Sequence, residues 1–246
     1  MIGFLHGIMG FFSWNDGISS WNDGDHDFDV SGWICAALCR GVKEIDLKLN
    51  NLGDVSPVFF TCHSLVNLKL DGVGSLDELG SNIEVPSDVF LGNLKTFYIR
   101  NSKFVGDSIN RLISNCHVLE DLAFIGCDVA NASELNIQSP SLKKLALSNF
   151  YSLDHVMVIN APNLVYFQYS GEIVEVHPLS NMKSLEKAEL RIWFQSSDDE
   201  IQDCDYETSV AHLIQGICNV RSLSFSLEVE ISSQLPVFHN LIELEF

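Results

Sequence analysis

The sequence predicts an α/β solenoid, in which short repeats stack side by side and contribute one strand each to a curved parallel sheet. Three observations predict it. A six-residue pattern, apolar-x-x-apolar-x-apolar, recurs nine times after about residue 40. The copies follow one another at a nearly constant step, and polar turn residues precede many of them. Self-similarity at a fixed step is the sequence signature of repeat architectures, so the whole chain is read as one array.

The nine copies differ in their residues but share the same internal spacing. Their first positions are separated by 23, 29, 25, 23, 22, 21, 35 and 21 residues, against about 20–29 for leucine-rich repeats. The long step contains an acidic insertion, Ser196 to Asp205. The sequence therefore predicts a leucine-rich-repeat solenoid of about nine irregular repeats. The copies are Val42/Ile45/Leu47, Leu65/Leu68/Leu70, Leu94/Phe97/Ile99, Leu119/Leu122/Phe124, Leu142/Leu145/Leu147, Leu164/Phe167/Tyr169, Leu185/Ala188/Leu190, Val220/Leu223/Phe225 and Leu241/Leu244/Phe246.

The strands are expected on the concave side of the solenoid, with short helices and irregular turns on the convex side. Apolar residues at helical spacing predict helices near residues 109–116 and 210–217, and a third over residues 32–39. Asp107 or Ser108 is expected to cap the first helix and Thr208 the second. Gly41 is expected to end the third.

Residues 1–30 break the pattern and are predicted to form an irregular or disordered acidic tail, with the solenoid over residues 31–246. The segment Ser13 to Gly17 is duplicated as Ser20 to Gly24 and is followed by an acidic run, Asp25 to Asp29. Gly, Asn and Asp at this density favour turns. A metal site in this run is the weaker alternative, because the closing Glu of a calcium loop is missing.

Charge and cysteine content narrow the class of partner and the compartment. The chain carries 14 Lys and Arg against 33 Asp and Glu, a net charge of −19, which disfavours nucleic acid as a partner. Seven cysteines at irregular spacing, most in apolar runs, favour free buried thiols and therefore the cytosol or nucleus. The apolar start, Met1 to Phe12, is too short to span a bilayer and lacks the basic residues of a secretory signal, so no membrane association is expected.

We find no motif that carries catalysis or a cofactor. The sequence contains no phosphate-binding loop, dinucleotide fingerprint, serine-hydrolase elbow or zinc-protease motif. Cys116 and His117 are adjacent, but they lack the third group that orients a nucleophile and its base. Cys35 and Cys39, one helical turn apart, are expected to pack in the core. The chain is therefore predicted not to be an enzyme, with no catalytic, cofactor-binding or metal-binding residues.

The functional prediction is geometric. Residues that alternate with the core positions of each strand are expected to line one continuous concave surface that binds a protein partner. This surface mixes both signs of charge and carries two tyrosines, and Tyr and Arg are typical interface anchors. The candidate partner-binding residues are Lys69, Thr96, Tyr98, Arg100, Asp121, Lys144, Tyr166, Gln168, Lys187 and Arg191. The alternative for each is an ordinary solvent-exposed strand residue.

Several stretches of the sequence resemble the leucine-rich-repeat region of the large plant F-box/LRR family, whose members also carry an FBD segment. They are Trp33 to Ala37, Arg40 to Leu47, Phe60 to Leu70, Leu94 to Thr96, Asn115 to Leu122 and Ile159 to Leu164, within a resemblance that spans about Trp33 to Phe246. His117 departs from the family pattern, which has a proline there.

The resemblance implies a role as the part of a ubiquitin-ligase substrate receptor that holds the substrate. In such receptors an F-box binds a Skp-type adaptor and the repeats hold the protein to be ubiquitinated. Neither an F-box nor an FBD pattern is found in the sequence, so adaptor binding is not expected. The alternatives are a degenerate or truncated structural repeat protein with no ligase role, and a sensor repeat domain like those of immune receptors.

Overall fold

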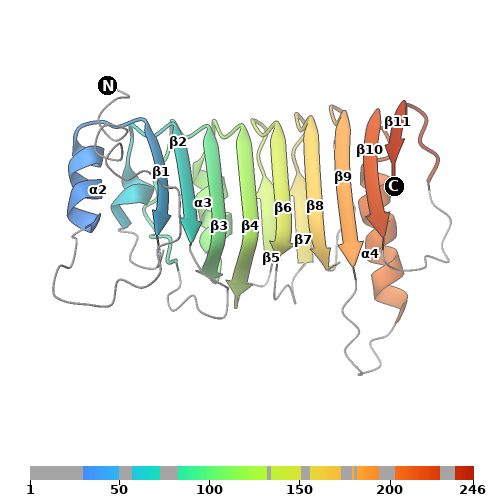
Figure 1. Cartoon of the computed structure of the whole chain (residues 1–246), viewed down its shortest axis with the longest axis horizontal. Helices are drawn as coiled ribbons and strands as arrows, with labels where there is room; N and C mark the ends of the chain where they lie inside the picture. The colour runs from blue at the N-terminus through green and yellow to red at the C-terminus, as the bar shows by residue number, and fades with distance from the viewer. Residues whose placement is uncertain are drawn as a thin grey trace, which may run out of the picture.

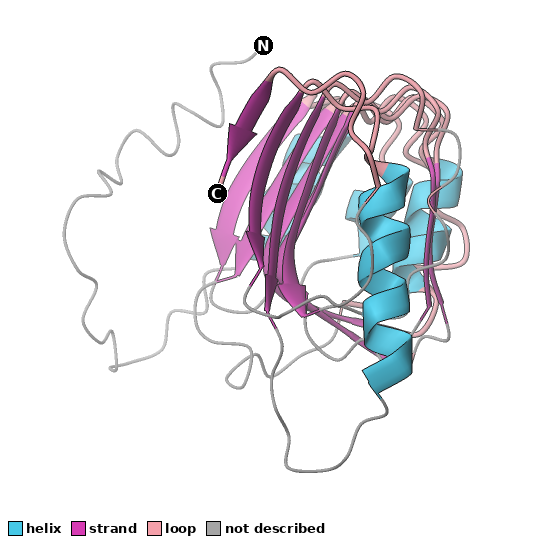
Figure 2. Ribbon diagram, turned by 90° about the vertical axis from the view of Figure 1, so that its right-hand side faces the viewer, coloured by secondary structure: helices cyan, strands magenta, loops and turns pink. Residues whose placement is uncertain are grey.

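A computed structural model describes residues 30–49, 57–72, 83–131, 134–150, 156–172, 179, 182–193, 203–227 and 236–246. The described chain forms two layers, a long parallel sheet and a second layer of helices and short strands on one of its faces (Figures 1 and 2). This arrangement confirms the predicted α/β leucine-rich-repeat solenoid. The predicted acidic tail lies outside the described residues apart from Val30, at which the first described helix begins.

Each of the nine predicted repeats contributes one strand to the main sheet. All neighbouring strands are parallel, and their order in the sheet follows their order in the chain. The same position of every repeat faces the same position of the next, which is the consequence of the near-constant step. The strands are β1 (Glu44–Leu49), β2 (Asn67–Gly72), β3 (Thr96–Val105), β4 (Asp121–Ala130), β6 (Lys144–Phe150), β8 (Tyr166–Glu172), β9 (Lys187–Trp193), β10 (Ser222–Leu227) and β11 (Glu243–Glu245).

Alternation within each strand places one set of side chains in the core between the two layers. Phe97 of β3, Leu122 of β4 and Leu145 of β6 are register neighbours and are almost completely buried. The rings of Phe97 and Phe104 both meet Phe124 edge to face, with centroids 5.9 Å apart in each pair. No single repeat can bury these side chains alone, so the core exists only because the repeats stack.

The second layer contains more regular structure than the sequence predicted. It holds α2 (Val30–Cys39), the 3₁₀ turn η1 (Pro57–Thr61), α3 (Ser108–Asn115) and α4 (Asp203–Gly216), and these helices lie on one side of the sheet (Figure 2). It also holds a two-stranded parallel sheet of β5 (Glu134–Gln138) and β7 (Val156–Asn160). At these two places strands stand where irregular turns were expected, because Leu135/Ile137 and Met157/Ile159 alternate as strands do and are buried.

The predicted helices are present, but one of their predicted ends is wrong and another lacks the expected side-chain capping bond. Gly41 follows α2 with a φ of 74°, the left-handed conformation expected of a helix stop. Asp107 is the N-cap residue of α3 without a side-chain capping bond, and the Ser108 hydroxyl donates back to the carbonyl oxygen of Val105 at 2.6 Å. Thr208 lies inside α4 and does not cap it, since this helix begins at Asp203.

Polar turn residues fix the spacing between repeats. The hydroxyls of Ser64 and Ser141 donate to the carbonyls of Val42 and Leu119, each the first core residue of the preceding repeat, at 2.7 and 2.8 Å. The side-chain amide of Asn163 donates to the carbonyl of Pro140 at 2.7 Å. These bonds explain why Ser or Asn so often precedes the first core residue of a repeat.

A second recurring position lies where the strands bend away from the main sheet. Asn101, Gly126 and Asn149 stand seven residues after the first core residue of their repeats, and all three have a positive φ between 50° and 59°. Asn and Gly tolerate this left-handed conformation better than other residues. The Asn101 side chain also donates to the carbonyl of Gly72 at 3.0 Å, so this position links one bend to the previous one.

Candidate interaction surface

The face of the main sheet opposite the helices is not covered by any other element among those that the structure describes (Figure 2). We call this the open face, and its outward side chains form three rows in register. The first row is Glu44, Asn67, Thr96, Asp121, Lys144, Tyr166, Lys187, Ser222 and Glu243. The second row is Asp46, Lys69, Tyr98, Ala123, Ala146, Gln168, Glu189, Ser224 and Glu245. The third row is Lys48, Asp71, Arg100, Ile125, Ser148, Ser170, Arg191 and Ser226.

All ten candidate partner-binding residues lie on the open face, and they fall into neighbouring groups. Lys69 is next to Tyr98 in the second row, and its ammonium lies 3.8 Å from the Asp46 carboxylate on the far side. Tyr98 is half-buried, and burial raises the pKa of its phenol above its usual value, while the neighbouring Arg100 opposes that rise. Arg100 is exposed at the end of this group. The group offers an aromatic ring beside a guanidinium, a common pairing at protein interfaces.

A second group surrounds Tyr166 on β8 and β9. The Lys187 ammonium lies 2.8 Å from the Glu189 carboxylate and 5.9 Å from the centre of the Tyr166 ring. The Tyr166 hydroxyl donates to the side-chain oxygen of Gln168 at 3.2 Å, and the Glu189 carboxylate lies near it. Burial and the Glu189 carboxylate raise the pKa of Tyr166 to about 12, so the phenol stays a neutral donor at physiological pH. This network orders the ring without burying it.

Glu189 completes this group, although the sequence reasoning did not select it as a partner-binding residue. The bond from Lys187 holds the pKa of the Glu189 carboxyl below its usual value, with a further contribution from Tyr166. The signal that identifies it is its position, two residues after Lys187 on the same strand and in register with Gln168. Side chains two apart on a strand lie on one face, so a basic and an acidic residue at this spacing can pair.

Between the two groups the open face carries small side chains. The second row contains Ala123 and Ala146 between Tyr98 and Gln168. Beside them in the first row, the Lys144 ammonium lies 3.8 Å from the Asp121 carboxylate, in an exposed pair that contributes little to stability. Thr96 is in register with Asp121. Each of the two tyrosine groups is therefore flanked by shorter side chains.

The open face is nearly neutral, in contrast to the chain as a whole. Its three rows hold six basic and seven acidic residues, whereas the complete sequence holds 14 basic and 33 acidic. Almost all of the excess of acidic over basic residues therefore lies outside the open face. On the central strands from β3 to β9 the three rows hold Arg100, Lys144, Lys187 and Arg191 against Asp121 and Glu189, so this part of the face is net basic.

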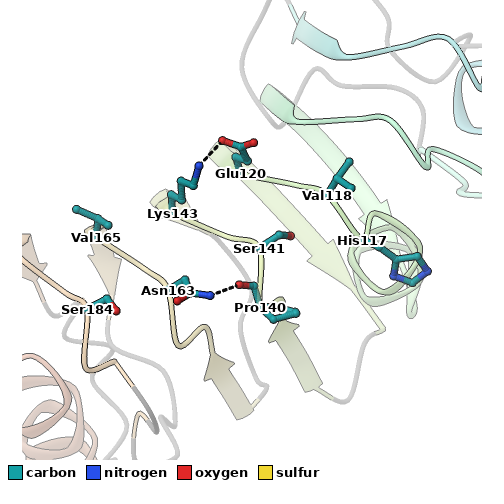
Figure 3. Close-up of a pocket in the computed structure, with 9 residues that line it drawn as sticks. All are labelled: His117, Val118, Glu120, Pro140, Ser141, Lys143, Asn163, Val165 and Ser184. Carbon is teal, nitrogen blue, oxygen red and sulfur yellow. Dashed lines mark hydrogen bonds and ion pairs between the residues drawn. The ribbon is translucent and has the colours of Figure 1, made fainter.

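A shallow hollow of about 550 Å³ lies on the rim formed by the turns that precede the strands, and not on the open face. Val118, Pro140 and Val165 give it apolar lining from three successive repeats (Figure 3). Beside them the Glu120 carboxylate lies 2.7 Å from the Lys143 ammonium and 3.2 Å from that of Lys95. The sequence reasoning did not predict this hollow. Its signal is Val118, an apolar residue at a turn position where other repeats place Ser or Asn.

The residues considered as catalytic or metal-binding candidates are not positioned for either role. Cys116 is buried, and burial raises the pKa of its thiol to about 12, so it is not a thiolate nucleophile at neutral pH. Cys35 is half-buried but Cys39 is exposed, so the expectation that both pack in the core was wrong. Among the described residues no three His, Cys, Asp or Glu side chains are grouped as metal ligands, and no helix is long and apolar enough to cross a membrane. The residues considered as a metal site in the N-terminal tail, Asp23, Asp25, His26 and Asp27, lie outside the described residues.

Comparison with known proteins identifies the repeats. The family described as FBD-associated F-box protein At5g56370, LRR repeats, matches residues 30–204, which include the strands from β1 to β9. The chain belongs to this family. The F-box/LRR assignment confirms the resemblance read from the sequence, including the stretches from Trp33 to Leu164.

Relatives of this F-box/LRR family member come from Arabidopsis thaliana. F-box/LRR-repeat protein At3g59250 is 33% identical over 230 residues, covering 87% of this chain and 52% of the relative. F-box/LRR-repeat protein At1g06630 is 33% identical over 229 residues, covering 88% and 53%. FBD-associated F-box protein At4g10400 is 30% identical over 223 residues, covering 88% and 49%. The chain spans about half the length of these relatives, and no solved structure matches it.

Proposed function

We propose that this leucine-rich-repeat region is a protein-binding platform and that its open face holds the partner. The observation that carries the proposal is the pair of tyrosine groups on that face. Tyr98 and Tyr166 are half-buried at their bases, and polar neighbours orient Tyr166 through hydrogen bonds. Ordered aromatic side chains provide contact area at a low cost in conformational entropy, which is why they dominate binding energy at protein interfaces.

The spacing of the two groups suits a folded or extended protein segment. Tyr98 on β3 and Tyr166 on β8 are separated by three strand steps, which corresponds to roughly 14 Å across the sheet. Ala123 and Ala146 lie between them, so larger side chains of a partner have room beside both rings.

We further propose that the bound protein is a substrate for ubiquitination, held by this region as part of an F-box type ligase receptor. The family membership supports this, because the relatives carry F-box in their names. No residue of this chain is assigned to adaptor binding. The working compartment in the proposal is the cytosol or nucleus, where free thiols such as those of Cys62, Cys116 and Cys127 stay reduced.

Proximity labelling in plant cells tests the platform. The chain is fused to a labelling enzyme and compared with the double variant Tyr98→Ala/Tyr166→Ala and with the control Trp33→Ala, which removes an exposed aromatic side chain from α2, outside the open face. We expect a set of proteins that the wild type and the control label and the double variant does not. Equal labelling by all three, with circular dichroism showing that each is folded, would rule out the open face as the binding surface.

A second readout tests the ligase part. The abundance of each protein lost in the double variant is followed after overexpression of the full-length gene product, with and without a proteasome inhibitor. A ubiquitination substrate falls in abundance and recovers with the inhibitor. A partner whose abundance does not change leaves the platform intact and contradicts the substrate-receptor role.

A further inference from the structure

Arg191 is one of the three basic residues on the open face that form no ion pair among the described residues, the others being Lys48 and Arg100. It is exposed on β9, and its register neighbours in the third row are Ser170 on β8 and Ser226 on β10. The nearest acidic residue on its own strand is Glu189, which is ion-paired with Lys187 at 2.8 Å, and the charge of Arg191 adds a smaller contribution to lowering the pKa of Glu189. In the part of the chain that the structure describes, the Arg191 guanidinium has no ion pair.

The neighbours of Arg191 in the same row are serines, of which Ser226 is exposed, Ser148 is half-buried and Ser170 is buried. Ser148, Ser170, Arg191 and Ser226 are consecutive register partners on four adjacent strands, which we call the Arg191 row. Four strands place its ends roughly 14 Å apart. A guanidinium only donates hydrogen bonds, and serine hydroxyls can donate as well as accept. A ligand that satisfies this row must therefore bring acceptors, and carboxylate oxygens match the fork of an arginine in two places at once.

Arg100 is a second guanidinium in the third row that has no ion pair among the described residues. It is exposed on β3, four strand steps from Arg191, or roughly 19 Å. Asp71 is its register neighbour but forms no ion pair with it among the described residues. Two unpaired guanidinium groups at this separation correspond to about six residues of an extended segment.

Building on the proposed function, we propose that the Arg191 row binds carboxylate side chains of an acidic segment in the partner protein. Both acidic residues on the central strands, Asp121 and Glu189, are already paired with Lys144 and Lys187. The unpaired charge that remains between β3 and β9 is therefore basic. Glu243 and Glu245 on β11 are near enough to act on Lys187, whereas charges farther away are screened within about 8 Å at physiological ionic strength.

Selection from a phage-displayed library of randomised 12-residue peptides on the immobilised chain tests this inference. We expect the selected peptides to be enriched in Asp and Glu relative to the unselected library. The binding of one selected peptide, labelled with fluorescein, is then measured by fluorescence anisotropy. Arg191→Ser is expected to weaken it about tenfold, since a charge-assisted hydrogen bond is lost.

Arg221→Ser is the matched control, because Arg221 is also exposed and also basic but belongs to the rim, one residue before the first row. It is expected to change the affinity less than twofold. Replacing the acidic residues of the peptide by Gln and Asn is expected to have the same effect as Arg191→Ser on wild-type protein and no further effect on that variant.

The outcomes separate this inference from the proposed function. Peptides that need Tyr98 and Tyr166 but carry no acidic residues, or that bind Arg191→Ser as well as wild type, overturn the inference and leave the platform standing. Selected peptides that are basic also overturn it. Selection of no peptide that depends on the open face contradicts both.

Discussion

The two faces of the main sheet are built from the same nine strands, but only the buried face carries the same type of residue in every repeat. On the buried face the register row that contains Phe97, Leu122 and Leu145 is apolar from end to end, because each side chain meets its counterpart in the next repeat. On the open face the row that contains Tyr98, Ala123 and Ala146 changes character at almost every strand. Stacking imposes the first pattern and leaves the second free to vary, so the variation is where information about a partner resides.

The largest expected difference between the faces comes from two adjacent residues of β3. Phe97→Ala removes a completely buried ring that packs against Phe124, and it should reduce the free energy of unfolding by about 3–5 kcal/mol. Tyr98→Ala, on the open face, should reduce it by no more than about 1 kcal/mol. Urea unfolding followed by circular dichroism measures both. Equal losses would mean that Tyr98 is a structural residue, which would weaken its assignment to the binding surface.

The contacts between successive bends are expected to give the next largest effect. A Cβ atom on Gly72 would clash with the carbonyl oxygen of Asn101, a backbone atom that cannot move without disturbing β3. Gly72→Ala should therefore cost about 1–3 kcal/mol of stability. Gly92→Ala is the control, since its Cβ would meet only the Phe90 ring at 3.5 Å, an ordinary contact. A thermal melt in which both variants resemble the wild type would show that the bends tolerate displacement.

A smaller effect is expected at the turns that link repeats. Ser141→Ala removes the hydrogen bond from its hydroxyl to the carbonyl of Leu119 and should reduce the free energy of unfolding by about 1 kcal/mol. Ser184 occupies the same turn position in a later repeat, but its hydroxyl has no hydrogen-bond partner among the described residues. Ser184→Ala should leave stability unchanged within about 0.5 kcal/mol. If chemical denaturation gives the two variants the same midpoint, the turn residues act through backbone preference and not through these bonds.

The fold was predictable because its rule is local and repeated. A period of two within each strand and a step of 21 to 25 residues between most of them predicted all nine strands and which face of the sheet the ten candidate residues occupy. The left-handed bends at Asn101, Gly126 and Asn149 carry an equally regular signal, which is an Asn or Gly seven residues after the first core position of the repeat. Asn and Gly there follow from the steric cost of a positive φ for other residues.

The sheet of β5 and β7 and the side-chain pairs on the open face depend on contacts that the repeat pattern does not determine. The sheet of β5 and β7 forms from segments outside the six-residue pattern, and Asn110 of α3 positions β5 by donating to the Glu134 carbonyl and accepting from the Asn136 amide, both at 2.8 Å. On the open face the sequence predicted which residues are presented but not which of them pair. The network of Tyr166, Lys187 and Glu189 is set by side-chain rotamers across two strands, and spacing alone does not determine it.

The smallest predicted effect tests whether that network is formed in solution. The bond from Lys187 is the largest cause of the lowered pKa of the Glu189 carboxyl, so Lys187→Met should raise that pKa toward its usual value. Carboxyl titration by carbon-13 NMR measures the change, with Lys144→Met, whose ammonium pairs with Asp121, as the control. Because the folded pKa of Glu189 is lowered, its contribution to stability is present above the unfolded pKa and is lost as the pH falls through the folded value. An unchanged Glu189 titration in Lys187→Met would show that the two side chains do not pair in solution, and Lys187 would then join Arg191 as a cation available to an acidic partner.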